Sequence, residues 1–293
     1  MQRNVLMRIL TALVALVLIA GSLPACAEEE EAADVWTNIL LLGCDSYTTN
    51  TRQRTDSMII FSVNMQTNQV KMTSLMRDTW IAVPGGGGHR KLTELCTVGG
   101  PEMTMRAINE NLGMNIDKYA LISMAGIAEI VDLIGGIEID VTEAERKALN
   151  KGLFDLSGLS GMEQLQESGE NVHLNGNQAT AYARIRKIDS DYIRVGRQRI
   201  VLMAMANKFK ANANPVTLLS IMTTLLNYVE TNMNLTEIMA LANVGLQVEL
   251  EEIEEFRVPV DGTYDSGTYN GVWSIRPNFS KNAQLLRDFI YGG

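Results

Sequence analysis

NILLLGCDSYTTNTRQRTDSMIIFSVNMQTNQVKMTSL, residues 38–75, holds three short apolar runs with polar residues between them. The first run, Asn38–Gly43, ends at glycine and is typical of a buried strand. Ser57–Val63 and Gln69–Leu75 predict two further strands, joined by the polar turn Asn64–Asn68. The chain is therefore expected to begin its folded part with strands that lie side by side in one sheet.

Predicted helices and strands alternate along the rest of the chain. Pro101 and Gly113 frame a helix over 101–112, because proline favours the first turn and glycine follows the last. About 265 residues after the N-terminal segment are enough for one large domain. Alternation of this kind predicts an α/β fold, with a mixed central sheet covered by helices on both sides. Further strands are predicted at Thr79–Val83, Lys118–Ser123, Ile137–Val141, Phe256–Val260 and Val272–Arg276, and further helices at Ala125–Ile134, Asn175–Ala183, 195–212, Val216–Glu230, Asn234–Leu246 and Ala283–Tyr291.

The N-terminal segment, residues 1–27, has the features of an export signal. Arg3 and Arg8 precede an uncharged run from Ile9 to Ala27. As a helix this run is about 28 Å long, close to the thickness of a bilayer core. Basic residues before it and Glu28–Glu31 after it predict that the amino end stays in the cytoplasm and the rest is exported.

Three fates of this segment stay open. It can remain as an uncleaved anchor, it can be cleaved after Ala27, or it can be a lipoprotein signal with Cys26 as the modified residue. In each case residues 28–36 follow as an acidic linker.

Five arginines occur within sixteen residues of a chain whose formal net charge is −9. Guanidinium groups are permanently charged and match two oxygens of a phosphate or carboxylate. The cluster therefore predicts an anion site, with phosphate as the favoured ligand. The alternative is a solvated basic helix face. Export and the acidic balance argue against nucleic acid as the partner. The five are Arg184, Arg186, Arg194, Arg197 and Arg199.

Two carboxylates accompany the first strands. Asp45 follows the first strand and Asp56 opens the second, so both can converge on one hard cation. Mg²⁺ takes one or two carboxylates and leaves its other positions to water and substrate phosphates. Together with fixed cations such as Arg77 and Lys91, this site suits phosphoryl transfer, whose transition state spreads negative charge over oxygens. The alternative for each single pair is a structural salt bridge.

Other catalytic patterns are missing from the sequence. It has no G-x-S-x-G motif, and Gly85–Gly88 is not followed by the G-K-[ST] ending of a P-loop. His89 and His173 are too few for a zinc site and are expected in loops.

Cys44 and Cys96 lie in the exported part, and both a single bridge and two buried thiols are compatible with the sequence. The chain also has sixteen methionines. They are expected to fill the core, with an adaptable groove for a lipid tail as the alternative.

Over residues 38–210 the chain resembles the LytR-CpsA-Psr family, exported ligases that attach glycopolymers to the bacterial cell wall. The segment that follows resembles a C-terminal extension of some members. Four blocks of sequence carry the resemblance: Asn38–Asp45 (NILLLGCD), Arg54–Met58 (RTDSM), Met76–Thr79 (MRDT), and Tyr182–Lys187 (YARIRK) with Asp189–Asp191 and Arg197–Arg199.

The resemblance implies a catalytic domain over 37–214 and an extension of helices and strands over 215–293 packed on it. It implies an apolar tunnel between sheet and helices for the tail of a polyprenyl pyrophosphate. It implies metal binding by Asp45 and Asp56, with Mg²⁺ as the ion and Mn²⁺ as its substitute. The resemblance implies catalytic roles for Asp45, Asp56, Arg77 and Arg184. It also implies that pyrophosphate is bound by Arg54, Arg77, Lys91, Arg184, Arg186, Asp191, Arg194, Arg197 and Gln198.

The implied reaction moves a glycan-1-phosphate from its polyprenyl carrier to a sugar hydroxyl of peptidoglycan, typically the muramic acid 6-hydroxyl. It takes place at the outer face of the cytoplasmic membrane. The polymer is a teichoic acid, a capsule or another wall glycan, and the proton acceptor is Asp56, Asp45 or a metal-bound water. Two alternatives are a non-catalytic binder of polyprenyl phosphates and a pyrophosphatase that uses water as acceptor.

The chain departs from the family pattern at three places. Met76 replaces a proline, Leu92-Thr93 replaces Ile-Asn after Lys91, and Ile193 replaces a glycine. Because a β-branched residue does not readily take the positive φ that glycine permits, Arg197 is the alternative to Arg194 as a phosphate ligand.

Overall fold

In a computed structural model, the structure describes residues 35–44, 53–157, 162–185, 191–211, 228–248 and 253–292, of which 154–157 and 191–195 as backbone alone. The chain divides into two units, Met1–Asp34 and Val35–Gly293, and the described residues all belong to the second. In those ranges no helix combines the length and the hydropathy that a membrane span requires. The predicted segment 1–27 and its three fates lie outside the described residues.

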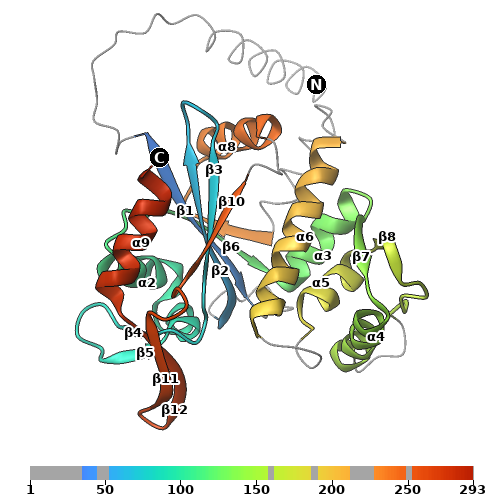
Figure 1. Cartoon of the computed structure of the whole chain (residues 1–293). Helices are drawn as coiled ribbons and strands as arrows, with labels where there is room; N and C mark the ends of the chain where they lie inside the picture. Colours follow the sequence, from blue (N-terminus) through green and yellow to red (C-terminus); the bar gives the residue numbers. More distant parts are fainter. Residues whose placement is uncertain are drawn as a thin grey trace, which may run out of the picture. The chain divides into compact units, whose positions relative to one another are not determined.

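A mixed six-stranded sheet forms the centre of the described unit (Figure 1). β1 (Trp36–Cys44) pairs antiparallel with β2 (Thr55–Asn64) and parallel with β6 (Lys118–Ser123). β2 continues through the predicted turn into β3 (Val70–Leu75). The edges are β10 (Glu254–Val258), parallel to β3, and β9 (Val229–Thr231), antiparallel to β6. The predicted mixed sheet is confirmed.

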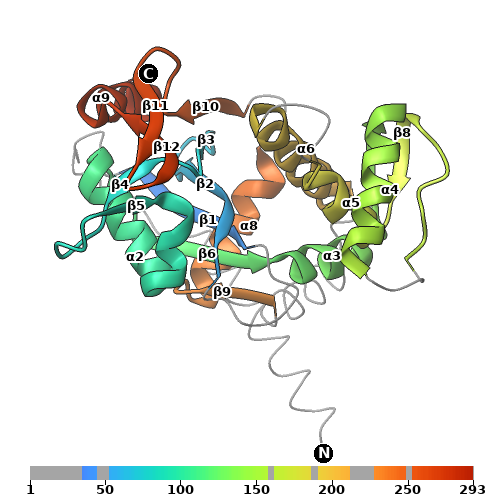
Figure 2. The same cartoon turned by 90° about the horizontal axis from the view of Figure 1, so that it is seen from below.

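Helices cover both faces of this sheet (Figures 1 and 2). Side chains alternate along a strand, so β2 sends Met58 and Ile60 to one face and Phe61 and Val63 to the other. Met58 and Ile60 belong to a core closed by α2 (Leu95–Leu112) and α9 (Phe279–Tyr291). Phe61 and Val63 pack with α6 (Asp191–Ala211) and α8 (Leu235–Gln247).

Helix α2 bends near the position predicted as its start. Gly99 and Gly100 leave helical geometry, with φ of 77° at Gly100, and the helix resumes at Pro101. The helix ends at Gly113, whose φ of 62° is accessible to glycine at little cost and whose N–H reaches the Asn109 carbonyl. The prediction of a helix over 101–112 is confirmed, and an additional turn precedes the bend.

A second core lies beside the sheet. It is built by α3 (Met124–Leu133), α4 (Glu143–Ser157), α5 (Gly176–Ala183) and part of α6, with the antiparallel pair β7 (Ile137–Val141) and β8 (Gly169–Leu174). Asn175 and Gln178 form a capping box at the start of α5. This cap fixes the helix that leads into the arginine cluster.

Two small hairpins complete the described unit. β4 (Trp80–Ala82) pairs with β5 (His89–Lys91), which runs into the 3₁₀ turn η1 (Leu92–Glu94). β11 (Tyr264–Tyr269) pairs with β12 (Val272–Pro277). Sequence periodicity missed β5, β8, β11 and α4, because these are short, exposed or strongly polar.

Several sequence predictions need correction. Residues 229 and 230 were expected to end a helix, but they form β9, because the free edge of β6 offers them backbone partners. His89 and His173 were expected in loops and lie in β5 and β8. Both edge strands of the sheet come from beyond residue 214, within the predicted extension.

The two cysteines of the described unit are buried thiols. Cys44 ends β1, Cys96 lies in the first turns of α2, both are 0% exposed, and no disulfide joins them. Burial, with Cys44 as a further contribution, raises the pKa of Cys96 to about 12. The bridge considered from the sequence is therefore absent.

We expect Cys96 to resist alkylation in the native protein at pH 8. A thiol with so high a pKa holds almost no thiolate, which is the reactive form, and its burial keeps reagents out. Peptide mapping after treatment with iodoacetamide should find Cys44 and Cys96 unlabelled in buffer and labelled in urea without a reductant. Labelling in urea that depends on prior reduction would contradict the structure.

Candidate functional site

The charged residues of two of the four blocks, RTDSM and MRDT, meet at one end of the sheet. β2 begins at Thr55 and β3 ends at Leu75, and because the two strands are antiparallel these ends are neighbours. Met76 to Thr79 then turn back, with the Thr79 N–H donating to the Met76 carbonyl at 3.1 Å. This turn places Arg77 beside Asp56 although the two are far apart in sequence.

Four side chains of alternating charge form one network. Arg77 Nη1 donates to Asp56 Oδ1 at 2.8 Å, and its Nε lies 3.5 Å from Asp78 Oδ2. Lys91 Nζ donates to Asp78 Oδ1 at 2.7 Å. All four side chains are between 12% and 23% exposed. Each cation is thus held in place and still reaches the surface, as a binding site for anions requires. We call Asp56, Arg77, Asp78 and Lys91 the strand-end network.

Arg54 lies outside this network. Its side chain is 68% exposed, and its Nη2 pairs with Glu94 Oε1 at 3.2 Å. An exposed pair of this kind contributes little to stability. Arg54 is therefore available to a ligand only at the rim of the strand-end network.

Arg184 follows α5 directly and is half-buried. Its N–H donates to the Ala181 carbonyl at 3.2 Å, which closes the last turn of the helix. The first turn of α6 lies at the same end of the sheet as the start of β2 (Figure 1). α5, which ends before Arg184, and α6, which carries Arg197 and Arg199, lie on the side of the sheet opposite α2 (Figures 1 and 2).

Arg197 points inward. Its side chain is 3% exposed, its Nε donates to Glu145 Oε1 at 2.8 Å, and its Nη1 donates to the Ile185 carbonyl at 3.4 Å. The guanidinium also lies over the Tyr182 ring, 5.9 Å from its centroid. Arg197 thus braces residues 182–185, and its contact with pyrophosphate stays a prediction.

Glu145 is itself held from two sides. Its Oε2 accepts from the N–H of Thr142 at 2.9 Å and from the Thr142 hydroxyl at 2.8 Å. Burial alone would raise the pKa of Glu145, but the hydrogen bonds from Arg197 and Thr142 outweigh it, and the pKa lies below its usual value. Burial likewise raises the pKa of Tyr182 to about 12. The carboxylate and guanidinium therefore form a charged pair inside the second core.

The other predicted site residues differ in burial and in contacts, and some lie outside the described residues. Gln198 is half-buried on α6, and Arg199 pairs with Glu255 on the edge strand β10. Residue 193 lies within the helical backbone of α6, so its isoleucine needs no positive φ. Two predicted site residues, Asp45 and Arg186, lie outside the described residues. Asp191 and Arg194 are described as backbone alone.

Sequence reasoning assigned no role to Asp78 and Glu145. Asp78 stands in the quoted block MRDT, between the two cations it joins. Glu145 closes the pattern Thr142-x-x-Glu145, the signature of a capping box, and that box is present at the start of α4. Both sequence motifs could be recognised, but the sequence did not show that Asp78 pairs with Lys91 or that Glu145 pairs with Arg197.

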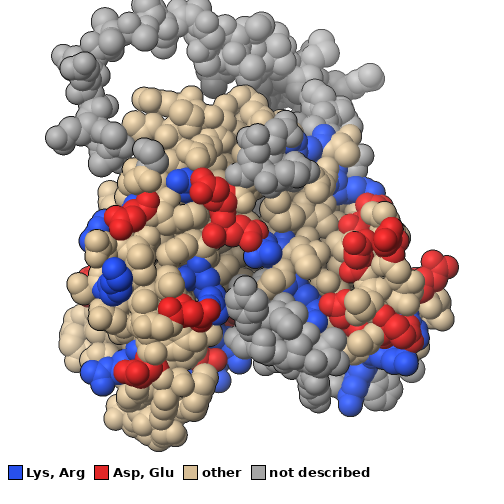
Figure 3. Space-filling view, in the orientation of Figure 1, with Lys and Arg blue, Asp and Glu red and all other residues tan. Residues whose placement is uncertain are grey.

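Basic and acidic side chains are mixed on the face seen in Figure 3. Among the residues that the structure describes, no three or more His, Cys, Asp and Glu side chains are placed to hold a metal ion.

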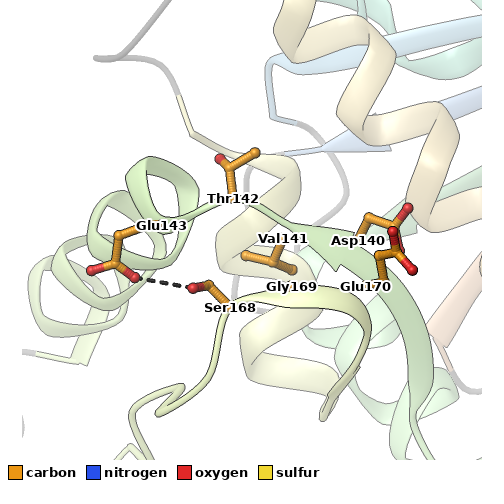
Figure 4. A pocket seen from close by; sticks show the side chains of 7 residues that line it. All are labelled: Asp140, Val141, Thr142, Glu143, Ser168, Gly169 and Glu170. Carbon is orange, nitrogen blue, oxygen red and sulfur yellow. Dashed lines mark hydrogen bonds between the residues drawn. The ribbon is translucent and has the colours of Figure 1, made fainter.

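Two pockets lie away from this network. One, of about 360 Å³, is formed where β7, α4 and β8 meet, and Asp140 and Glu170 lie side by side at its edge (Figure 4). Ser168 donates to Glu143 Oε2 at 3.2 Å across its other side. Carboxylates repel anions, so this pocket does not suit a phosphate. The other, of about 440 Å³, lies along α2 between Gly99 and Asn109.

Comparison with known proteins shows the family of the chain. Residues 24–285 match the profile of the LytR_cpsA_psr family. The chain is 30% identical over 216 residues to the polyisoprenyl-teichoic acid–peptidoglycan teichoic acid transferase TagV of Bacillus subtilis, covering 71% of this chain and 52% of TagV. It is 28% identical over 238 residues to the transferase of the same description, TagU, of Bacillus mycoides, covering 80% of this chain and 72% of TagU. The chain thus spans about half the length of TagV and more of TagU.

Solved structures show the same fold. The crystal structure of B. subtilis TagV has a TM-score of 0.68 and 25% identity, covering 87% of this chain and 97% of that one. A structure of TagT bound to LI-WTA has a TM-score of 0.69 and 23% identity, covering 91% of this chain and 94% of that one.

Proposed function

The chain belongs to the LytR-CpsA-Psr family, and on that premise we propose that it is an exported phosphotransferase that attaches a glycopolymer to peptidoglycan. The donor is a glycan linked through pyrophosphate to a polyprenyl carrier, and the acceptor is a sugar hydroxyl of peptidoglycan. The relatives TagV and TagU, both named teichoic acid transferases, make a teichoic acid the first polymer to test, with a capsule as the second. The predicted N-terminal segment would hold the enzyme at the outer face of the membrane.

The strand-end network is the observation that carries this proposal. A pyrophosphate is multiply anionic, and Arg77 and Lys91 present two positioned cations whose carboxylate partners keep them from moving. Fixed charges aimed at developing negative charge lower a barrier without reorganising during the reaction. Arg184, with Arg54, Arg186, Arg194 and Gln198 as predicted, would add donors around the same phosphates.

The proposed transfer is a single displacement at phosphorus. The acceptor hydroxyl oxygen forms a bond to the phosphorus that carries the glycan, and the bond from that phosphorus to the bridging oxygen breaks. Polyprenyl phosphate leaves with the electron pair, and the hydroxyl proton passes to a carboxylate. Asp56 is the described candidate for that proton acceptor, and Asp45 is the other.

The donor set suits Mg²⁺, with Mn²⁺ as its substitute. Asp56 is a partly buried carboxylate at a strand end, and Asp45 follows the neighbouring strand in sequence, so two acids with oxygen ligands are supplied. Because Mg²⁺ commonly uses one or two carboxylates, a cluster of three acids is not required. When bound, the ion would neutralise phosphate charge.

Apolar side chains that remain exposed support a place for the lipid tail. On α8, Leu235 is 55% and Met239 39% exposed, and on α6, Ile200 is 41% exposed. Met203 on α6 and Leu241 on α8 pack against the core that includes Val63 and Val70 of the sheet, and both are only partly buried. Leaving this apolar surface in water is unfavourable by about 25 cal/mol per Å². A polyprenyl chain between α6, α8 and the sheet would contact Met203 and Leu241, whereas Leu235 and Met239 lie on the side of α8 away from Val244 and would not be covered.

We expect the exported part of the chain to transfer a sugar phosphate in a defined mixture. A synthetic polyprenyl-pyrophosphate sugar, Mg²⁺ and a short peptidoglycan oligomer are incubated with the protein, and products are read by mass spectrometry. A sugar phosphate on the oligomer, lost on chelation, is the expected result. Free sugar phosphate would instead indicate a pyrophosphatase, and bound but unchanged lipid would indicate a binding protein.

A further inference from the structure

The outer side of α8 is exposed and carries no charge. A surface helix normally turns charged residues to water on the side opposite the core. On α8 the single charged residue, Glu237, pairs instead with Lys118 at 2.7 Å. Val244 packs toward the sheet, and Leu235 lies on the opposite side of the helix. The exposed residues at four-residue spacing, which we call the α8 stripe, are Leu235, Met239, Asn243 and Gln247.

Both ends of α8 are attached to the end of the sheet at which the folded chain begins. Near the start of α8, Glu237 holds Lys118, the first residue of β6, which runs parallel to β1. At its end, Gln247 Oε1 accepts from Asn68 Nδ2 at 2.8 Å, in the turn between β2 and β3. β1 begins beside this turn, because Trp36 pairs with the last residue of β2. Figure 1 shows α8, the turn and the start of β1 at one end of the described unit.

The turn between β2 and β3 adds another apolar side chain at this end. Met65 is 40% exposed, and its N–H donates to the Val35 carbonyl at 3.3 Å, where the described chain begins. In Figure 3 the surface over α8 and this turn shows neither basic nor acidic side chains. Single exposed apolar residues are common, but an uncharged surface that also carries Leu235, 55% exposed, and Met239, 39% exposed, indicates a contact.

The length of the chain before β1 indicates what this surface meets. Seven residues, 28–34, separate Ala27 from Val35. A stretch of this length reaches at most about 25 Å. The uncharged run that ends at Ala27 is predicted to lie in the bilayer, so the start of β1 stays close to the membrane. A tether also raises the effective concentration of the two surfaces, so that a contact made by few side chains is sufficient.

We propose that the α8 stripe, together with Met65, rests on the outer leaflet of the membrane. The inference takes the N-terminal anchor from the proposed function and uses no other part of it. Apolar side chains of a helix that lies in the interface sink about 5–10 Å into the boundary between headgroups and acyl chains. Leu235 and Met239 suit that depth. Asn243 and Gln247 are neutral and hydrogen-bond headgroups, so no charge has to leave water.

The test is fluorescence quenching by lipid, on the full chain in vesicles of phosphatidylglycerol and phosphatidylethanolamine. Cys26→Ala leaves only Cys44 and Cys96, both buried, so that Met239→Cys carries the single environment-sensitive label. Doxyl-labelled phosphatidylcholine in the vesicles should quench this label. Circular dichroism of each variant checks that the fold is unchanged.

A label at Val272→Cys is the matched control, because Val272 is 40% exposed and Met239 39%. Val272 belongs to the hairpin β11–β12, which is attached at the other end of β3, where the Ile275 N–H donates to the Asp78 carbonyl at 2.9 Å. Quenching at Met239 should exceed quenching at Val272 at least about threefold, since only the first label would reach the headgroup boundary. Leu235→Ser should reduce the quenching at Met239, because it removes the neighbouring apolar contact.

Two results would overturn the membrane contact. One is equal quenching at the two labelled positions. The other is a Met239 label that lipid does not quench but that cross-links two copies of the chain, which would assign the surface to a second copy.

Transfer is measured separately, because quenching requires no donor and no acceptor. Strong quenching at Met239 in a chain that moves no sugar phosphate would support the membrane contact and count against the transferase. Transfer by a chain with equal quenching at both positions would keep the transferase and overturn the membrane contact.

Discussion

Replacing Arg77 by glutamine should reduce glycan-phosphate transfer by about 10²- to 10³-fold while the protein stays folded. Arg77 is the centre of the strand-end network, bound to Asp56 at 2.8 Å and close to Asp78 at 3.5 Å. Glutamine keeps polarity and approximate length but removes the permanent charge. The pyrophosphate then loses a cation whose position is set by two carboxylates. The measurement is kcat for transfer with saturating donor, read by mass spectrometry.

A matched arginine separates charge at the site from charge on the surface. Arg106, on α2, is 58% exposed and pairs with Glu110 at 3.8 Å. Arg106→Gln makes the same chemical change outside the network and should transfer at the wild-type rate. Transfer by Arg77→Gln within a few-fold of wild type would remove Arg77 from the proposed machinery, and a loss in both variants would point to overall charge.

Replacing Glu145 by alanine should lower the free energy of unfolding by about 3–5 kcal/mol. The variant leaves the Arg197 guanidinium, 3% exposed, without the carboxylate that now lies 2.8 Å from it. It also removes the acceptor that caps α4 through Thr142. Urea unfolding followed by circular dichroism measures the change. Because Arg197 braces residues 182–185, transfer should fall as well.

Two further variants make this result specific. Glu143→Ala removes a neighbouring carboxylate that is 50% exposed and pairs with Arg146, and it should have little effect on stability. Replacing both members of the buried pair, Glu145→Leu with Arg197→Met, should cost less than Glu145→Ala alone, since no charge remains buried. A double variant as unstable as the sum of the two single variants would contradict a direct pair.

The buried pair also predicts a pH dependence. The pKa of Glu145 is lower in the folded protein than its unfolded value of about 4.3. Its contribution to stability is therefore present above that pH and is lost as the pH falls through the folded pKa. Urea unfolding at several pH values below 5 should show a flatter curve for Glu145→Gln than for wild type. Parallel curves would mean that Glu145 does not titrate with folding.

Local patterns were sufficient for most of the framework. The apolar runs at 38–43, 57–63 and 69–75 became β1, β2 and β3, because each alternates or ends as a strand does, and the turn between the last two is polar. Proline and glycine at 101 and 113 placed α2 because their backbone preferences act within a few residues. The charged residues grouped around Asp56, Arg77 and Arg184 could be recognised directly in the sequence.

Long-range contacts decided the rest. The apolar periodicity of the sequence could not show that residues 229–231 pair with β6 as a strand, because the edge of β6 exists only in the folded sheet. The sequence presents Arg197 and Arg184 as equal members of one cluster. Packing against Glu145, Ile185 and Tyr182 turns Arg197 inward and leaves Arg184 half-buried at a helix end.

The fold class, the family and the residue types of the proposed phosphate site could be read from the amino-acid sequence, since these depend on local spacing and composition. Tertiary structure alone decided which charges are paired, that Cys44 and Cys96 stay thiols, and that Trp80 and Tyr269 share one surface. The physical reason is that pair geometry and burial depend on residues brought together from distant parts of the chain. Chain position does not encode that proximity.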